Sequence, residues 1–238
     1  MNLLITICAR GGSKGIPGKN IKLLNGRPLL HYTLSHAQQF ADVHKADIQI
    51  STDSDEILAC AAEMGYSTNY QRPLDLASDT AGKIDVIKHV WEWAENELNK
   101  KYDYVLDLDV TSPLRTQSDL TEALSIILAE PRALNIFSVS PAARNPYFNI
   151  VELNADGFAT VCKSNHQIKS RQQAPKVYDM NASFYVFSRE FMEGDYSRST
   201  TERSLIHVMK HVCFDLDEPI DFKVLEIMLK EKLIDFSI

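Results

Sequence analysis

The feature that most constrains this chain is a glycine-rich, cationic segment that directly follows an apolar strand. Leu3–Cys8 (LLITIC) has the pattern of a short buried strand, and the segment ARGGSKGIPGKN (9–20) follows it. Glycines let backbone amides approach a ligand closely, and successive amides can form an anion-binding concavity. The cations of the segment, Arg10, Lys14 and Lys19, can add charge-assisted hydrogen bonds to phosphate oxygens. The segment therefore predicts a polyphosphate site at the end of the first strand.

Two better-known phosphate-binding loops do not fit the spacing of these glycines, which stand at positions 11, 12, 15 and 18. A Walker A loop would need glycine at position 13 and a hydroxyl at position 20, where the chain has Ser13 and Asn20. The G-x-G-x-x-G spacing of dinucleotide-binding folds does not occur there either. The alternative is a solvated surface turn, but glycines and cations coincide where open α/β sheets place their ligands.

Apolar strand patterns alternate with amphipathic helical patterns through the first half of the chain. The predicted strands are Leu3–Cys8, Ala46–Thr52, Tyr104–Val110 and Asn135–Ser140. The predicted helices are Pro28–Phe40, Ser54–Met64, a helix with one face from Ile84 to Leu98, and Ser118–Glu130. This order predicts an α/β fold with a mostly parallel, doubly wound sheet, in a single domain that spans residues 1–238.

The alternation of strand and helix patterns stops in the segment from about 141 to 185. This segment carries three prolines and two short strand patterns around the turn at 154–157. We expect an inserted antiparallel excursion there, and its aromatic residues Tyr147, Phe148 and Tyr178 suggest an exposed surface that makes a homodimer. The predicted elements of this part are the strands Asn149–Leu153, Phe158–Lys163, Phe184–Ser188 and Val212–Leu216, and a final helix over Pro219–Leu233.

The composition excludes several classes of protein. A net charge of -7 argues against general binding of nucleic acid, where a basic footprint is expected. The sequence has no apolar run long enough for a membrane span and no signal-peptide pattern at its start, so we expect a cytoplasmic protein. Its four cysteines are scattered and form no C-x-x-C pair, so the sequence supports neither a zinc-binding motif nor a redox motif.

Two Asp-x-Asp pairs stand at the ends of predicted strands. Alternation along a strand puts Asp215 and Asp217 on one face, where Mg²⁺ could neutralise them. The alternatives are two solvated carboxylates or a cap for the final helix. In the other pair, Asp109 lies nearer than Asp107 to the expected ligand crevice, and we expect Asp107 to have a partner within the fold.

Arg171, in the segment RQQAP (171–175), could bind a carboxylate through its planar guanidinium. The alternative is a solvated arginine. The turn from Thr111 to Arg115 offers hydroxyls and another guanidinium, or it is only a loop with an ion pair. The seven histidines are scattered and form no recognisable nucleophilic arrangement, so covalent catalysis has no support in the sequence.

Taken in order, several segments resemble the CMP-sialic acid synthetase (acylneuraminate cytidylyltransferase) family over nearly the whole chain. These segments are ARGGSKGIPGKN (9–20), STDSDEI (51–57), RPLDLASDTAGK (72–83), TSPLRT (111–116), RQQAP (171–175) and DLDEPIDF (215–222). The resemblance implies a Mg²⁺-dependent enzyme in which the anomeric hydroxyl of a nine-carbon 2-keto sugar acid attacks the α-phosphate of CTP. The products would be the CMP-sugar and pyrophosphate, and catalysis would rest on positioning and electrostatics.

The resemblance also implies roles for individual residues. Arg10 and Lys19 would hold the triphosphate, and Asp215 and Asp217 would bind Mg²⁺, with Arg10, Lys19 and Asp217 the catalytic residues. The sugar acid would be contacted by Arg171, Gln172 and Asp109, with Arg171 serving its own or the neighbouring subunit's site. The residues that would contact CTP are Gly11, Gly12, Ser13, Asn20 and Arg72.

Departures from the family pattern fall on the sugar side of the predicted site. The chain has Asp109-Val110 where sialic acid synthetases usually have Gln-Pro, and it has Lys83 where they carry small polar residues. These departures favour a sialic-like bacterial sugar, such as legionaminic acid, over sialic acid itself. The alternatives are the eight-carbon acid Kdo, a different acceptor such as a sugar-1-phosphate or a molybdopterin cofactor, and a nucleotide-binding module without catalysis.

Overall fold

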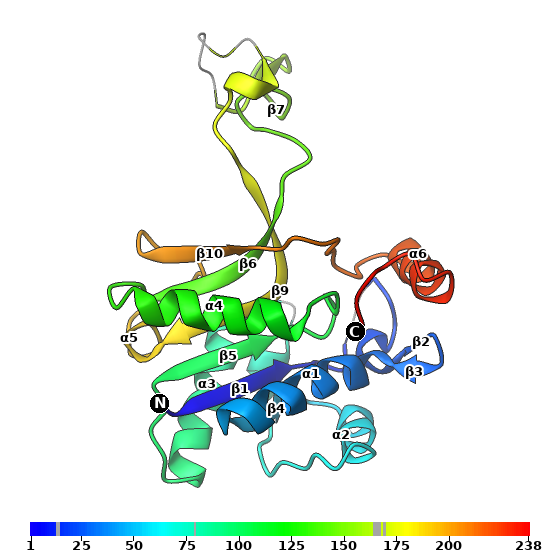
Figure 1. Ribbon diagram of the computed structural model, residues 1–238, viewed down its shortest axis with the longest axis vertical. Coiled ribbons are helices and arrows are strands. Elements are labelled where there is room, and N and C mark those ends of the chain that lie inside the picture. Colours follow the sequence, from blue (N-terminus) through cyan, green and yellow to red (C-terminus); the bar gives the residue numbers. More distant parts are fainter. Residues whose placement is uncertain (13–14, 79, 164–167, 169) are drawn as a thin grey trace.

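The computed structural model describes residues 1–12, 15–78, 80–163, 168 and 170–238. Within them, a six-stranded sheet forms the centre of the body, in the order β10-β6-β9-β5-β1-β4 (Figure 1). Its strands are β1 (Leu3–Cys8), β4 (Asp47–Ser51), β5 (Tyr104–Leu108), β6 (Asn135–Pro141), β9 (Tyr178–Ser188) and β10 (Ser204–Val208). Only β9 runs antiparallel to its neighbours in this sheet, so the predicted mostly parallel α/β fold is confirmed.

Two apolar cores lie on opposite faces of the sheet, and side chains that alternate along the strands belong to one core or the other. Ile5 and Ile7 of β1 pack in a core with helices α1, α2, α4 and α6, while Leu4 packs in a second core with α3 and α5. The bounds of these helices are α1 (Leu29–His44), α2 (Asp55–Ala62), α3 (Lys83–Glu97), α4 (Gln117–Ala129), α5 (Arg189–Glu193) and α6 (Pro219–Lys230). Helices on both faces are the doubly wound arrangement that the sequence predicts.

Local signals in the sequence explain where several helices begin. The Ser54 hydroxyl accepts a hydrogen bond from the Ile57 amide at the start of α2. Thr116 and Asp119 form a capping box at the start of α4, in which each side chain accepts from the backbone of the other. Pro219 occupies the first position of α6, where its missing amide hydrogen costs nothing.

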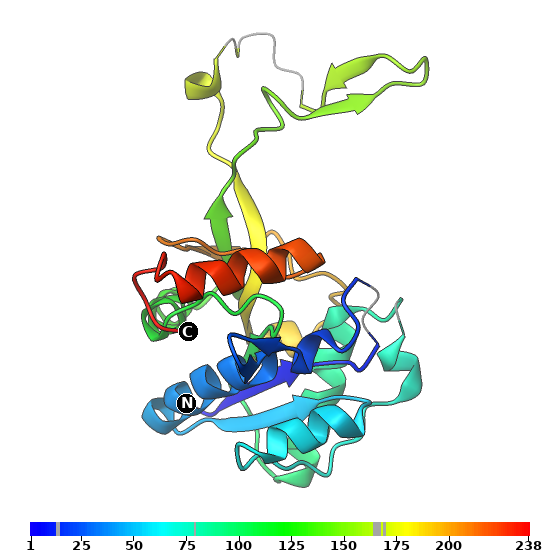
Figure 2. The same cartoon turned by 90° about the vertical axis from the view of Figure 1, so that its right-hand side faces the viewer.

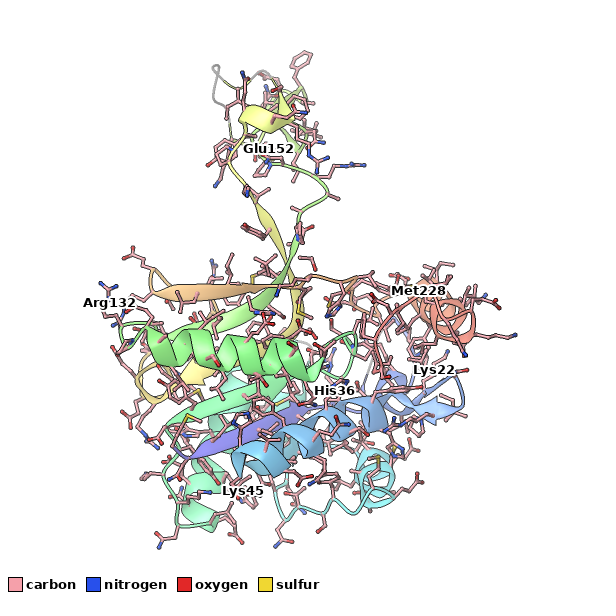
Figure 3. All side chains as sticks on the ribbon, in the orientation of Figure 1. Lys22, His36, Lys45, Arg132, Glu152 and Met228 are labelled. Atoms are coloured by element: carbon pink, nitrogen blue, oxygen red, sulfur yellow. The ribbon has the colours of Figure 1, made fainter. Side chains whose placement is uncertain are left out.

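Residues 142–163, 168 and 170–177 belong to an arm that leaves the body (Figures 1 and 2). The outer ends of β6 and β9 form its stem, in which Val139, Ser140 and Pro141 pair with Met180, Asp179 and Tyr178. The arm carries the antiparallel hairpin of β7 (Val151–Leu153) and β8 (Ala159–Val161), and the short helix η3 (Arg171–Gln173). Glu152, labelled in Figure 3, lies on this arm, well away from the helices of the body.

Two strand expectations differ from the structure. The strand predicted at Phe184–Ser188 already begins at Tyr178, because its first part pairs with the end of β6 in the stem of the arm. The strand predicted at Val212–Leu216 is wrong, since these residues form no strand. The edge position beside β6 is taken by β10, and the segment 212–216 buries Leu216 without pairing with a strand.

The C-terminal helix closes over the first loop of the chain. Helix α6 packs against the small hairpin of β2 (Leu23–Leu24) and β3 (Arg27–Pro28). The Lys22 ammonium lies 5.2 Å from the ring centroid of Phe222 in α6. Figure 3 shows Lys22 close to the helix that carries Met228. This packing brings the segment before α6 next to the glycine-rich loop. Among the described helices, none is long and apolar enough to cross a membrane.

Candidate active site

A cavity of about 420 Å³ opens beyond the carboxyl ends of β1 and β5. The chain runs from β1 to β4 on one side and then to β5 on the other side, so the strand order reverses between β1 and β5. Open α/β sheets bind ligands at such a switch point. The lining includes Cys8, Arg10, Gly15, Lys19, Asn20, Arg72, Leu76, Ser78, Ala81, Lys83, Val86, Asp109, Thr111 and Asp217.

One wall of the cavity is cationic, as the glycine-rich segment predicts. Arg10 and Lys19 come from this segment, and Asn20 ties its two ends together by donating to the Arg10 carbonyl oxygen at 2.9 Å. Arg72 is only 7% exposed and donates to the Ser51 hydroxyl and carbonyl oxygens at 2.9 and 2.6 Å. These contacts leave Arg72 at the cavity wall in a fixed orientation, suited to bind one part of an anionic ligand.

The glycines of the segment take different positions. Gly15 lines the cavity, whereas the Gly11 amide donates to the Asp53 carboxylate at 2.9 Å. Gly12 is exposed, and Ser13 lies outside the described residues. A phosphate that used the Gly11 amide would therefore have to displace Asp53. The roles predicted for these three residues stay predictions.

Acidic residues meet the cationic segment at this cavity. Asp217 lines the cavity, and one of its carboxylate oxygens accepts a hydrogen bond from the Lys19 ammonium at 3.2 Å. Asp215 lies deeper, and its Oδ1 atom is buried with no hydrogen-bond partner among the residues that the structure describes. Burial raises the pKa of Asp215 to about 6, Asp109 and Asp217 add to this rise, and Ser112 and Lys83 oppose it.

The two aspartates fit a bound divalent cation. A buried, unpartnered carboxylate oxygen next to a second carboxylate is costly without a positive charge. Mg²⁺ prefers one or two carboxylates together with phosphate oxygens. Asp215 and Asp217 could supply the carboxylates, and a nucleotide held by Arg10 and Lys19 could supply the phosphates.

The two residues of the second Asp-x-Asp pair, Asp107 and Asp109, lie in the different surroundings that the sequence predicts. Asp107 is buried and accepts a hydrogen bond from the Thr6 hydroxyl at 2.8 Å, so its partner is within the fold. Asp109 lines the cavity. The guanidinium of the nearby Arg115 is fully buried and donates to the carbonyl oxygens of Asp109 and Ser112. Arg115 therefore supports the loop after β5 from within the fold.

The predicted sugar residues Arg171 and Gln172 do not lie at this cavity. They belong to η3 on the arm, and the Arg171 guanidinium contacts the Ala142 carbonyl oxygen at 3.4 Å. Figures 1 and 2 show the arm extending away from the body that contains the cavity. Within one chain, the geometry does not bring Arg171 to the nucleotide side.

Another group of potential metal ligands lies between α1 and α2. It consists of His31, Cys60 and Glu63, whose ligand atoms lie within 4.8 Å of one another. However, the Nε2 atom of His31 is 2.8 Å from the Cys60 carbonyl oxygen. This hydrogen bond engages the nitrogen that a metal would need, so the contact serves to join the two helices.

Sequence reasoning missed part of the cavity. Gly15, Cys8 and Thr111 were not singled out as site residues, and Lys83 was noted only as a departure from a family pattern. The position of Thr111, two residues after Asp109 and three after the last residue of β5, could have identified it, because strand ends meet at the ligand crevice. Ser78 and Ala81 belong to the segment RPLDLASDTAGK (72–83), whose resemblance pointed to the nucleotide.

Relatives share this architecture over the full length of the chain. A protein of Campylobacter coli named post-translational flagellin modification protein B is 38% identical, over 97% of this chain and 96% of its own. The CMP-N,N'-diacetyllegionaminic acid synthase of Campylobacter jejuni is 35% identical with the same coverage. A solved structure of CMP:2-keto-3-deoxy-manno-octonic acid synthetase complexed with CTP shares the fold, with a TM-score of 0.70 and 15% identity. That match covers 98% of this chain and 100% of the other.

The family assignment rests on the sequence as a whole. Residues 4–235 match the family model described as cytidylyltransferase. This match covers nearly all of β1, every later element to α6 and all the residues given above as lining the cavity. The chain belongs to the cytidylyltransferase family.

Proposed function

We propose that the protein transfers CMP from CTP to a nine-carbon 2-keto sugar acid of the sialic or legionaminic type and releases pyrophosphate. The observation that carries this proposal is the convergence of Arg10, Lys19, Arg72 and Asp217 on one cavity at the switch point of the sheet. Full-length relatives named CMP-N,N'-diacetyllegionaminic acid synthase, from Campylobacter jejuni and Legionella pneumophila, support the acceptor class.

In this proposal Arg10 and Lys19 bind the triphosphate, and Arg72 and Asn20 orient the nucleotide, together with Gly11, Gly12 and Ser13 of the same segment. Asp215 and Asp217 hold Mg²⁺, which when bound neutralises charge on the phosphates. The acceptor hydroxyl attacks the α-phosphate, the bond between the α- and β-phosphates breaks, and pyrophosphate leaves. The protein contributes by placing these groups and by stabilising charge, with no covalent intermediate.

A pyrophosphate-release assay tests the reaction. We expect CTP-dependent release with N,N'-diacetyllegionaminic acid, less with N-acetylneuraminic acid and least with Kdo. The Asp217→Asn variant should keep the fold and lose about 100-fold or more in turnover, as expected when a charge contact to a reacting phosphate is removed. Kdo as the best acceptor would favour the alternative eight-carbon substrate, and release only with a sugar-1-phosphate would contradict the proposal.

We also propose a homodimer in which the arm of one subunit completes the cavity of the other. The arm exposes apolar side chains, among them Leu153 and Phe158, which are 72% and 71% exposed. Such exposed apolar surface is typical of a protein interface. Arg171 lies on the same arm and would reach the carboxylate of an acceptor bound in the neighbouring subunit.

Mixing two inactive variants tests this arrangement. Arg171→Ala and Asp217→Asn should each be nearly inactive alone. In a mixed dimer, one site would combine the intact Arg171 of one subunit with the intact Asp217 of the other. Random exchange of subunits in equal amounts should therefore restore about a quarter of the wild-type activity. A monomer at micromolar concentration, or a mixture without any recovery, would contradict the shared site.

A further inference from the structure

A second hollow meets the cavity at Lys83, the first residue of α3. It has a volume of about 350 Å³ and is bordered by α3, by β9 and by the loop that follows α5. Among the described residues, only Lys83 lines both the cavity and this hollow. Its ammonium is held at the boundary by two carboxylates, 2.9 Å from Asp109 Oδ2 and 3.2 Å from Asp107 Oδ2. A ligand in the hollow would therefore be a direct neighbour of a nucleotide in the cavity.

The hollow combines a buried apolar floor with a polar rim. The floor consists of Ile84, Tyr185 and Phe187, all of which are buried. At the exposed rim, Ser197 and Arg198 contribute a hydroxyl and a guanidinium. Sites for small molecules are typically apolar with a few well-placed polar groups. This combination fits an acylamino group, whose methyl group is apolar and whose carbonyl oxygen accepts hydrogen bonds.

The loop that carries Arg198 is held at two points. The Lys88 ammonium donates to the Gly194 carbonyl oxygen. The side-chain amide of Asn135, which is fully buried, donates to the Ser199 carbonyl oxygen. The backbone on both sides of Arg198 is therefore fixed before a ligand arrives, which lowers the entropic cost of a contact with its side chain.

Arg198 differs from the arginines near it in the chain. Arg189 forms an ion pair with Glu95, and Arg203 forms one with Glu190. Arg198 forms no hydrogen bond or ion pair with any residue that the structure describes. Its guanidinium therefore keeps its donors for a ligand in the hollow.

We infer that Arg198 is a specificity-determining residue, which donates a hydrogen bond to the carbonyl oxygen of an acylamino group on the acceptor acid. This inference rests on the proposed function for the class of the acceptor and for its position beside the nucleotide. The attacking hydroxyl must lie at the triphosphate in the cavity, so the substituted end of the acid extends past Lys83 into the hollow. There the apolar floor takes the methyl group of the acyl substituent, and Arg198 binds its oxygen.

Pyrophosphate-release kinetics with two acids test this role. N,N'-diacetyllegionaminic acid carries acylamino groups, whereas 2-keto-3-deoxynononic acid carries hydroxyls and no acylamino group. Arg198→Ala should raise the KM for the first acid about tenfold, as expected when a hydrogen bond from a charged donor is lost, and leave the KM for CTP unchanged. For the second acid, the KM, or the inhibition constant if this acid does not react, should stay within about twofold, because no hydrogen bond to an acyl oxygen is lost.

Arg203→Ala is the matched control, because it removes another arginine near the same loop that does not line the hollow. It should leave all three constants within about twofold, since an exposed ion pair contributes little. An unchanged KM for the diacetyl acid in Arg198→Ala, or an equal rise for both acids, would overturn the inference. Wild-type protein that releases no pyrophosphate with any nine-carbon acid would refute the proposed function as well, so the two failures are distinguishable.

Discussion

Gly15 has no side chain, so the glycine-rich loop can approach the backbone of Asp217 more closely than it could with any other residue at position 15. A Cβ atom at this position would lie 2.5 Å from the Asp217 carbonyl oxygen, whereas ordinary contacts begin at 3.4 Å. The backbone around Asp217 is held in place, because its amide donates to Asp221 Oδ2 at 2.9 Å and the Leu216 amide donates to Thr111. In Gly15→Ala, the loop and Asp217 must therefore separate by about 0.9 Å, the difference between these two distances.

This displacement moves Lys19 relative to Asp217, across the place where we expect the triphosphate and the metal. A misplacement of about 1 Å can cost about 100-fold in rate, which corresponds to about 2.7 kcal/mol of activation free energy. We therefore expect Gly15→Ala to lower kcat/KM by about 100-fold in the pyrophosphate-release assay. The melting temperature should change little, because Gly15 is exposed and outside the apolar cores.

Gly82→Ala is the matched control. Its Cβ would meet Asp85 Oδ2 at 2.6 Å, nearly the same distance, but this atom is the end of a side chain that can rotate away. Gly82 also lies next to the same cavity, between Ala81 and Lys83. We expect Gly82→Ala to retain activity within about threefold, since only an immovable contact displaces the site. Near-normal activity of Gly15→Ala, or equal damage in both variants, would refute this reasoning.

Two further predictions concern stability. Ala182 has a left-handed backbone (φ 52°), which costs about 1–2 kcal/mol for a residue with a Cβ. In a urea titration, Ala182→Gly should therefore raise the free energy of unfolding by about 0.5–1 kcal/mol. The control Ala123→Gly, inside α4, should lower the free energy of unfolding by about 1 kcal/mol. A hydrogen bond to Asp119 raises the pKa of His211 above its ordinary value of 6.5, with Asp235 adding to the rise. The stabilisation from protonated His211 is complete below that value and disappears as the pH rises through the raised pKa, so the stability advantage of wild type over His211→Gln should be larger at pH 6 than at pH 9. An equal advantage at both pH values would contradict the assignment.

Local patterns in the sequence predict much of the fold. The strands β1, β4, β5 and β6 and the helices α1 to α4 lie within a few residues of their predicted positions, because each shows a clear apolar pattern. The order of the strands in the sheet does not follow from these patterns. The segment at 212–216 shows why: its alternation predicts a strand, but β10 occupies the edge of the sheet beside β6, and alternation alone does not tell which segment pairs there.

The site is predictable where one segment carries its chemistry and less so where distant segments meet. Arg10, Lys19 and Asn20 stand together in a single loop, and the structure places all three at the cavity. The ion pairs of Lys83 could not be predicted from the sequence, since they depend on where the fold places Asp107, in β5, and Asp109, just after it. Arg115 is the opposite case. Its guanidinium lies beside the site but is buried, and it donates to the backbone of the loop after β5.

The segment that carries Asp215 and Asp217 obtains its position from other parts of the chain. It has no strand partner among the described residues, and it contacts the first loop through Gly15 and Lys19, the loop after β5 through Thr111, and the first turn of α6 through Asp221. A change in either loop can therefore also change the position of Asp217 relative to Lys19. For this reason, we expect triphosphate binding by the first loop and metal binding by Asp217 to strengthen each other, as linked equilibria require when both ligands favour the same arrangement.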